Sequence, residues 1–233
     1  MNRFSEIIFT TLLSLVTCSE AIAAFTLDRS RYIYEEGQKN ISVNITNKAD
    51  KVFGGQVWID NVGIPDGVYM IPSPSFFKID SGEKQIIRIS RVDTPLPRDR
   101  ESLFLINTQE IPPAPEKKEG ASVSFAIKTQ LKLIWRPSSL IKGREGAEEQ
   151  IQYAERDGKT WIYNPTPYYF AITEIKTDGK RVALNDTVQP SVSRLAPFGK
   201  VSLEKRLSGK ISIAAVEDNG GVREYLLSPA VKF

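Results

Sequence analysis

The chain has 233 residues, of which 41% are hydrophobic and 25% are charged, a composition ordinary for a globular protein. Its net charge of +3 is too small to predict a nucleic-acid partner. Histidine is absent and Cys18 is the only cysteine, which excludes His-dependent nucleophiles and nearly all zinc sites. No glycine-rich phosphate-binding motif is present. We therefore expect no enzyme, no catalytic residue, no metal and no cofactor, although a carboxylate pair for glycoside hydrolysis is left open.

Residues 1–23 have the features of a secretory signal peptide. A short positive start precedes the apolar run Ile7–Val16, and Ala21-Ile22-Ala23 fits the small-x-small cleavage pattern. We predict cleavage after the last of these alanines. Because no later stretch is long enough to cross a bilayer, we expect a mature protein without a membrane span. The context of Cys18 fits a lipoprotein site poorly, so we interpret it as part of the signal and expect no disulfide.

Short segments with alternating apolar residues follow the signal, and no window shows a convincing 3.6-residue period. In the first half of the chain, strands are predicted over Ile41–Ile45, Gln56–Asp60, Gln85–Ser90 and Ser102–Ile106. Turns are predicted at Asp66-Gly67, Ser81-Gly82, Asp157-Gly158, Asp178-Gly179 and Asn219-Gly220. Regular strands between such turns, over about 100 residues, favour a β-sandwich.

A second run of strands begins after the polar, glycine-containing segment Lys142–Gln150. These strands are predicted over Ile151–Ala154, Thr160–Tyr163, Tyr168–Ile175, Arg181–Leu184, Lys200–Leu203, Lys210–Val216 and Tyr225–Leu227. Two sandwiches therefore fit the chain better than one. We expect an all-β protein with an N-terminal domain over residues 24–142 and a C-terminal domain over residues 143–233.

The segment Ala121–Pro137 is an unusually long alternating pattern. Its apolar positions are Val123, Phe125, Ile127, Leu131, Leu133 and Trp135, and the intervening positions include Lys128, Lys132 and Arg136. Because strands usually have about 5–6 residues, we expect one end to extend beyond the sheet, at the Pro-rich charged loop Ile111–Gly120. Apolar side chains exposed there would mark a partner site, and an open edge could donate a strand. The alternative is an ordinary core strand.

Five motifs, in order along the whole mature chain, resemble the periplasmic chaperones of chaperone–usher pilus assembly. They are Leu27-Asp28-Arg29-Ser30-Arg31, Asp99-Arg100-Glu101-Ser102-Leu103-Phe104, Glu110-Ile111-Pro112-Pro113, Lys132-Leu133-Ile134-Trp135-Arg136-Pro137 and Asn164-Pro165-Thr166-Pro167-Tyr168-Tyr169. The resemblance implies a protein of the periplasm with two immunoglobulin-like β-sandwich domains arranged at an angle. It also implies that the protein folds pilus subunits and delivers them to an outer-membrane usher, its two partners.

The resemblance implies that the chaperone inserts a strand of its own into the groove that an incomplete pilus subunit exposes. The residues that match this donor strand are Val123, Phe125, Ile127 and Leu131. Burial of each side chain could contribute roughly 1.5–3 kcal/mol, before the ordering cost of association. The loop before the strand is short and no cysteine flanks the strand, which resembles the short-loop subclass of the family.

The resemblance also implies a site for the C-terminal carboxylate of the subunit. By motif its two cations are Arg31 and Lys132, and both can donate charge-assisted hydrogen bonds to a carboxylate. The alternative is two solvated surface cations. Strict alternation places Lys132 on the face opposite Leu131. Either a bulge changes the register of the strand, or the cleft uses that other face.

Glu101, Arg136 and Asp218 match positions that form an ion-pair network between the domains of this family. Since one arginine can fork between two carboxylates, we expect them to have a structural role at the domain junction. The alternative function is a secreted immunoglobulin-like adhesion module, which would also be built of β-sandwiches. Such a module has no need of Arg31 and Lys132 in one cleft, and this difference separates the two hypotheses.

Overall fold

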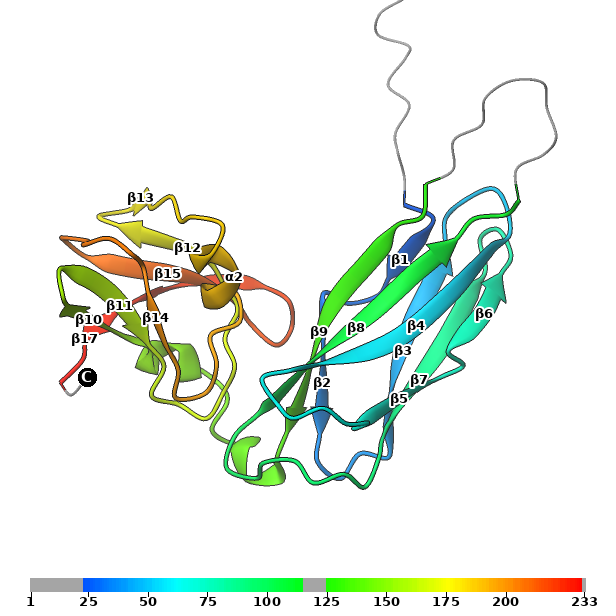
Figure 1. The fold of residues 1–233 in the computed structure, drawn as a ribbon, viewed down its shortest axis with the longest axis horizontal. Helices are drawn as coiled ribbons and strands as arrows, with labels where there is room; N and C mark the ends of the chain where they lie inside the picture. Colours follow the sequence, from blue (N-terminus) through cyan, green and yellow to red (C-terminus); the bar gives the residue numbers. More distant parts are fainter. Residues whose placement is uncertain (1–22, 115–124, 232–233) are drawn as a thin grey trace, which may run out of the picture.

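In the computed structural model, which describes residues 23–114 and 125–231, the chain folds into two β-sandwiches (Figure 1). The expected all-β class with two sandwiches is therefore confirmed. The predicted signal peptide lies outside the described residues, except for its last alanine. The predicted donor residue Val123 also lies outside them.

The N-terminal sandwich has one sheet in the strand order β1-β3-β7-β5 and another in the order β2-β9-β8-β4-β6. The strands of the first sheet are β1 (Phe25–Leu27), β3 (Asn40–Asn47), β7 (Lys84–Arg91) and β5 (Met70–Ser73). Those of the second are β2 (Arg31–Glu35), β9 (Lys128–Arg136), β8 (Ser102–Ile111), β4 (Phe53–Val62) and β6 (Phe76–Ile79). Only β2 and β9 pair in parallel among these strands, and they do so at one edge of the second sheet.

The C-terminal sandwich has the sheet orders β14-β11-β10-β17 and β13-β12-β15-β16. The first sheet contains β14 (Lys200–Ser202), β11 (Lys159–Tyr163), β10 (Gln152–Arg156) and β17 (Ser228–Pro229). The second contains β13 (Lys180–Arg181), β12 (Ile172–Thr177), β15 (Ile211–Val216) and β16 (Val222–Leu226). The chain leaves β16 in one sheet and enters β17 in the other, so its last described strands connect the two layers.

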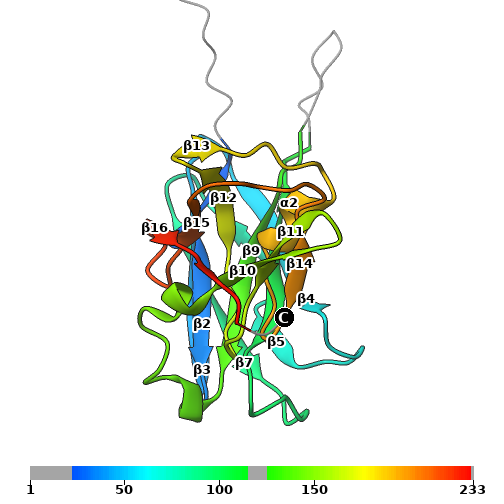
Figure 2. The same cartoon turned by 90° about the vertical axis from the view of Figure 1, so that its left-hand side faces the viewer.

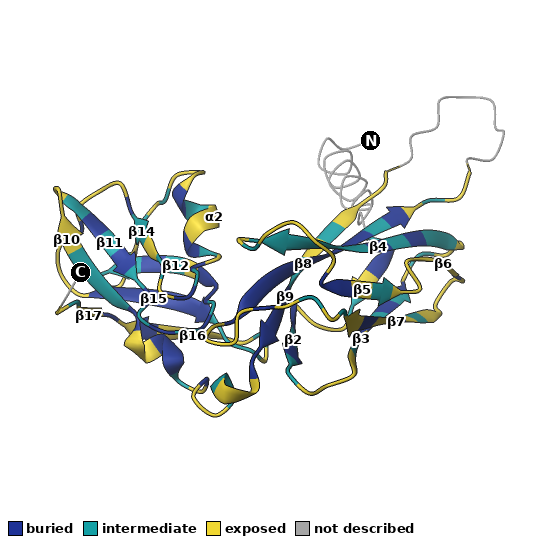
Figure 3. Ribbon diagram, turned by 60° about the horizontal axis from the view of Figure 1, so that its bottom comes forward, coloured by how far each residue is buried: buried dark blue, intermediate teal, exposed yellow. Residues whose placement is uncertain are grey.

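Each sandwich has a hydrophobic core of its own, and the two clusters share no residue. Alternate residues of β9 contribute to the first core, because Leu133 and Trp135 are fully buried and Leu131 packs against them from the rim. Ile172 and Ile213 lie at the centre of the second. Figure 3 shows these buried segments along β8 and β9 in one domain and along β15 in the other.

Two of the predicted turns have the geometry that only special residues tolerate. Asp157-Gly158 joins β10 to β11 with φ values of 53° and 71°, and Asp178-Gly179 joins β12 to β13 with φ values of 48° and 77°. Two successive positive φ angles define the type I′ hairpin turn, which favours Asp-Gly because glycine has no Cβ and aspartate tolerates the left-handed region.

One expectation for the C-terminal domain is wrong in detail. The segment Arg181–Leu184 is not a strand beyond its first residue, and it leads instead into the five-residue helix α2 (Val188–Val192). The side chain of Asn185 accepts a hydrogen bond from the backbone nitrogen of Val188 at 2.8 Å, so it stabilises the start of this helix. One turn of helix is too short to produce a detectable 3.6-residue period, which is why the sequence pattern missed it.

The junction between the domains follows β9 directly. Pro137 begins a linker that contains two 3-10 turns, Ser138–Leu140 and Ala147–Gln150. From this junction the two sandwiches extend in different directions, so the two domains are arranged at an angle to each other (Figure 1). Viewed from the side of the C-terminal sandwich, the two domains lie one behind the other (Figure 2). The junction is therefore where residues of both domains come together, and it contains most of the predicted site.

Candidate functional site

Arg31 and Lys132 are register partners in the parallel pair of β2 and β9. Neighbouring strands lie about 4.8 Å apart and register partners point to the same face of a sheet, so the two cationic side chains share one face. The pairing of β8 with β9 continues without an irregularity along the whole strand. Hence the strand has no bulge here, and Lys132 lies with Arg31 on the face opposite Leu131.

The Arg31 side chain is buried against the C-terminal domain. The residue is only 6% exposed, and its Nη1 donates a 2.7 Å hydrogen bond to the carbonyl oxygen of Val216 at the end of β15. Its Nε is buried and has no hydrogen-bond partner among the residues that the structure describes. Lys132 is half-buried beside it. Among residues 23–114 and 125–231, neither side chain forms an ion pair with a carboxylate, so the two charges are not neutralised in pairwise contact.

The electrostatics of the pair favour an anion. Burial lowers the pKa of Lys132, and the positive charges of Arg31 and Arg194 lower it further. Burial also lowers the pKa of Arg31, which the negative charge of Asp218 opposes. Two cations held together without an anion destabilise each other. A bound carboxylate would relieve this repulsion and could accept hydrogen bonds from both side chains.

The lowered pKa leads to a prediction for the free protein. Folding disfavours the charged form of Lys132, so this destabilisation is full at neutral pH and disappears as the pH rises through the folded pKa towards about 10.4, the unfolded value. Lys132→Met should therefore raise the melting temperature at pH 7, and its advantage over the parent should shrink in alkaline buffer. Thermal melts of both proteins across this pH range measure the effect, with Lys78→Met on β6 as an exposed control. A variant that melts below the parent at pH 7 would contradict it.

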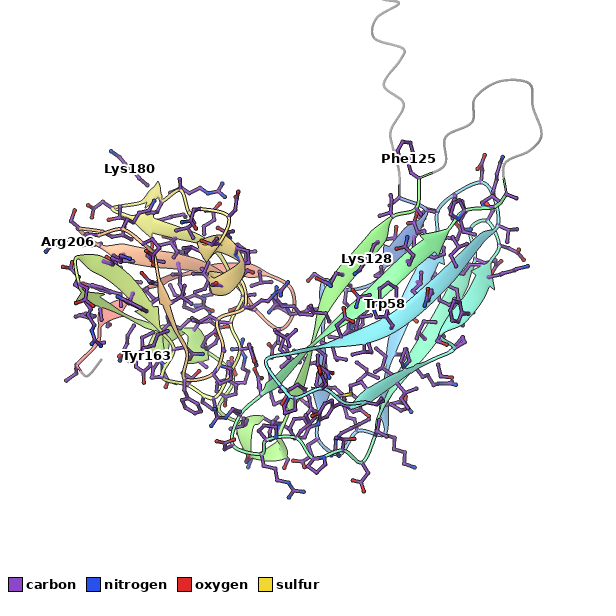
Figure 4. The ribbon with its side chains drawn as sticks, viewed as in Figure 1. Trp58, Phe125, Lys128, Tyr163, Lys180 and Arg206 are labelled. Atoms are coloured by element: carbon purple, nitrogen blue, oxygen red, sulfur yellow. The ribbon has the colours of Figure 1, made fainter. Side chains whose placement is uncertain are left out.

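The segment just before β9 exposes apolar side chains. Phe125 is 78% exposed and Ile127 is 40% exposed, whereas Leu133 is fully buried. Regular pairing begins only at Lys128, and just before it the Ile127 carbonyl oxygen accepts a 3.0 Å hydrogen bond from the backbone nitrogen of Glu110. Figure 4 shows Phe125 beyond the end of the sandwich, and Lys128 above Trp58 on the sheet face. The apolar pattern therefore continues past the strand that the domain itself uses.

The structure brings Glu101, Arg136 and Asp218 together at the junction. Arg136 donates through Nε to a Glu101 oxygen at 2.6 Å, and its Nη1 lies 2.8 Å from an Asp218 oxygen. The second Glu101 oxygen accepts a 2.7 Å hydrogen bond from the backbone nitrogen of Tyr169. Arg136 and Glu101 are almost fully buried. These bonds connect β8 and β9 of the first domain to the C-terminal domain, as the sequence motif predicts.

A second arginine of the junction escaped the sequence analysis. Arg144 is buried in the linker and forms a double hydrogen bond with Glu148. Their i,i+4 spacing was the available signal, but the linker shows no helical period that would single out this pair. For the hairpin that contains Asp218, the sequence predicted only the turn Asn219-Gly220. The local pattern does not indicate that this hairpin contacts the N-terminal domain.

The described residues contain no group of three or more His, Cys, Asp or Glu side chains that could hold a metal ion. Within the same part of the chain, no helix has the length and apolar character needed to cross a membrane.

The chain has two β-sandwiches joined by a buried ion-pair network. A pair of cations lies at the junction end of a strand whose other end leads into exposed apolar residues. These features are those of the class of two-domain assembly chaperones. Residues 24–141 match the family model of the pili and flagellar-assembly chaperone PapD N-terminal domain. Residues 146–227 match that of the pili assembly chaperone PapD C-terminal domain. The chain belongs to this family of fimbrial chaperones of the chaperone–usher type, and the predicted resemblance is confirmed.

Individual relatives agree with this assignment. The chain is 44% identical over 227 residues to the chaperone protein FanE of Escherichia coli, with 97% of each chain covered. The crystal structure of the periplasmic chaperone SfaE is 26% identical with a TM-score of 0.69, and the match covers 88% of this chain and all of the other. A Salmonella enterica structure of the SafA pilin in complex with the SafB chaperone has a TM-score of 0.76 at 20% identity, covering 89% and 97%, which supports the immunoglobulin-like fold alone.

Proposed function

We propose that this protein binds pilus subunits in the periplasm, completes their fold by donor-strand complementation and delivers them to an outer-membrane usher. It acts by binding and has no catalytic activity. The observation that carries this proposal is the difference between the two ends of β9. The junction end of β9 holds Lys132 beside the buried Arg31, and the other end leads into the exposed Phe125 and Ile127. This arrangement suits an unpaired apolar strand that ends in a carboxylate.

Each proposed residue has a distinct task. Arg31 and Lys132 bind the C-terminal carboxylate of the subunit, which also sets the register of an otherwise slippery strand pairing. Val123, Phe125 and Ile127 fill the subunit groove, together with Leu131 at the point where the strand enters the sandwich. Leu131 already packs against the core of this protein, so it offers less free surface than Phe125. We also propose that the loop before this strand is short, as in the short-loop subclass of the family.

The junction residues Glu101, Arg136 and Asp218 are proposed to hold the two domains at a fixed angle. Support comes from the near-complete burial of Glu101 and Arg136, because separating a buried ion pair leaves an uncompensated charge in the interior and is strongly destabilising. We place the domain boundary between residues 142 and 143, after an N-terminal signal peptide that ends at residue 23. Arg144 just beyond this boundary bonds to Glu148, which is consistent with the linker folding together with the second domain.

Co-purification tests the proposed function. A tagged form of the full chain, expressed together with the fimbrial subunits of its own cells and isolated from a periplasmic extract, should carry a small β-rich subunit in a one-to-one complex. Recovery of the protein without any subunit, from cells that make the subunits in excess, would contradict the proposal. It would favour the alternative of a secreted immunoglobulin-like adhesion module.

A further inference from the structure

The linker contains a buried ion pair next to the ion-pair network of the junction. Arg144 donates from Nη1 to one Glu148 oxygen at 2.8 Å and from Nη2 to the other at 2.6 Å. Its side chain is 8% exposed and that of Glu148 is 1% exposed. Both atoms of the guanidinium fork are thus used by one carboxylate, which holds the arginine in a single orientation. The pair by itself stabilises only the linker, because its members are four residues apart.

Two further contacts extend this pair across the junction. Arg144 Nη2 lies 3.4 Å from the Asp218 oxygen that Arg136 does not use. The guanidinium also packs over the rings of Tyr168 and Phe170, with distances of 5.6 and 5.3 Å to the ring centroids. Arg136 lies 6.0 Å from the same Tyr168 ring. Two arginines therefore share one carboxylate and one aromatic ring, and each limits where Asp218 can lie.

Asp218 belongs to a tight hairpin that also contacts the proposed carboxylate site. In this turn the Gly220 backbone nitrogen donates a 2.9 Å hydrogen bond to the Glu217 carbonyl oxygen. The Glu217 backbone nitrogen donates a 2.8 Å hydrogen bond to the Gly221 carbonyl oxygen. The residue that precedes the turn is Val216, whose carbonyl oxygen accepts the hydrogen bond from Arg31. A displacement of Asp218 would thus be transmitted over two residues to the group that holds the Arg31 side chain.

We propose that Arg144, oriented by Glu148, is a positioning residue for the carboxylate site. It holds Asp218, and through the short hairpin it holds the Val216 oxygen that accepts the hydrogen bond from Arg31. This inference rests on the proposed function, because it assigns Arg144 a part in carboxylate binding without contact to the carboxylate. It also gives the linker a role that its sequence, polar and without a regular period, does not suggest.

The arrangement of the domains provides the first test. The only cysteine of the chain, Cys18, lies in the predicted signal, so spin labels can be placed at Lys78→Cys in one domain and Lys180→Cys in the other. Both lysines are exposed. Double electron–electron resonance should show a narrow interdomain distance in the parent and a broader or shifted one in the double variant Arg144→Gln/Glu148→Gln. The double variant removes both buried charges, so neither is left unpaired within the fold.

The carboxylate provides the second test. A synthetic peptide that copies the last strand of a co-purified subunit is made with a free C-terminal carboxylate and with a C-terminal amide. The parent should bind the acid at least about tenfold more tightly than the amide. In Arg144→Gln/Glu148→Gln this acid-to-amide ratio should fall close to one, while affinity for the amide is unchanged. Arg144→Lys, which keeps the charge but not the fork, should give an intermediate ratio.

The controls separate this inference from the proposed function. Arg206→Gln breaks an exposed 2.9 Å ion pair with Glu155 on the C-terminal domain and should change neither measurement. If Arg31→Ala leaves the acid-to-amide ratio at the parent value, the carboxylate site itself is refuted. If Arg31→Ala lowers the ratio but the Arg144→Gln/Glu148→Gln variant keeps both the ratio and the parent distance, Arg144 is a local stabiliser of the linker and the inference is overturned.

Discussion

Lys132→Ala and Arg31→Ala should each abolish recovery of a pilus subunit while the free protein stays folded. The carboxylate of the subunit would be left with one cation in a partly buried site, at a cost of about 2–5 kcal/mol, which corresponds to more than a tenfold loss of affinity. The measurement is pull-down of the co-expressed subunit from periplasmic extract, with thermal melts of the free variants run in parallel. Either variant that recovers as much subunit as the parent would refute the carboxylate site.

The two substitutions differ in how cleanly they test the site. Arg31→Ala also removes the hydrogen bond to the Val216 carbonyl oxygen, so it alters the domain junction as well as the charge. Within the described part of the chain, Lys132 forms no such bond, and its loss should relieve repulsion in the free protein. Lys132→Ala is therefore the sharper test. Lys128→Ala, four residues earlier on the same face of β9, serves as a matched control that should retain the subunit.

Phe125→Ser and Leu133→Ser should separate capture of the subunit from stability of the fold. Leu133 is fully buried, so its replacement should lower the free energy of unfolding by about 2–5 kcal/mol. Phe125 is 78% exposed, so serine there removes little native burial and should barely change the melting temperature. The same substitution places a hydroxyl where a subunit groove accepts an aromatic ring, and it should strongly weaken capture.

Thermal melts and subunit pull-downs on the two variants decide this prediction. Val68→Ser is the matched control, because Val68 is also exposed in the N-terminal domain but lies outside the donor segment. It should change neither the melting temperature nor the yield of subunit. A Phe125→Ser variant that melts as early as Leu133→Ser would show that this segment belongs to the core of the domain. The donor-strand hypothesis would then lose its main physical support.

Local patterns in the sequence were sufficient for the class of fold and for much of its detail. Asp157-Gly158 and Asp178-Gly179 predicted hairpin turns because few other dipeptides tolerate two positive φ angles. The parity of Leu131, Leu133 and Trp135 predicted the core face of β9, since successive side chains of a strand point to opposite faces. The motif around Arg136 correctly indicated its two carboxylate partners, although only through the family resemblance.

Other features were decided only by the tertiary structure. Arg31 and Lys132 are far apart in the chain and meet because β2 and β9 pair in parallel, a choice of partner that alternation within either strand cannot reveal. Regular pairing of β9 with β8 begins at Lys128, although the apolar pattern extends back to Phe125 and β8 itself continues to Ile111, so the pattern within the segment does not predict where the strand begins. The link from Arg144 through Asp218 to Arg31 requires a hairpin of the second domain to reach the first. Such contacts form when the two folded domains pack against each other, and the pattern within one segment cannot predict them.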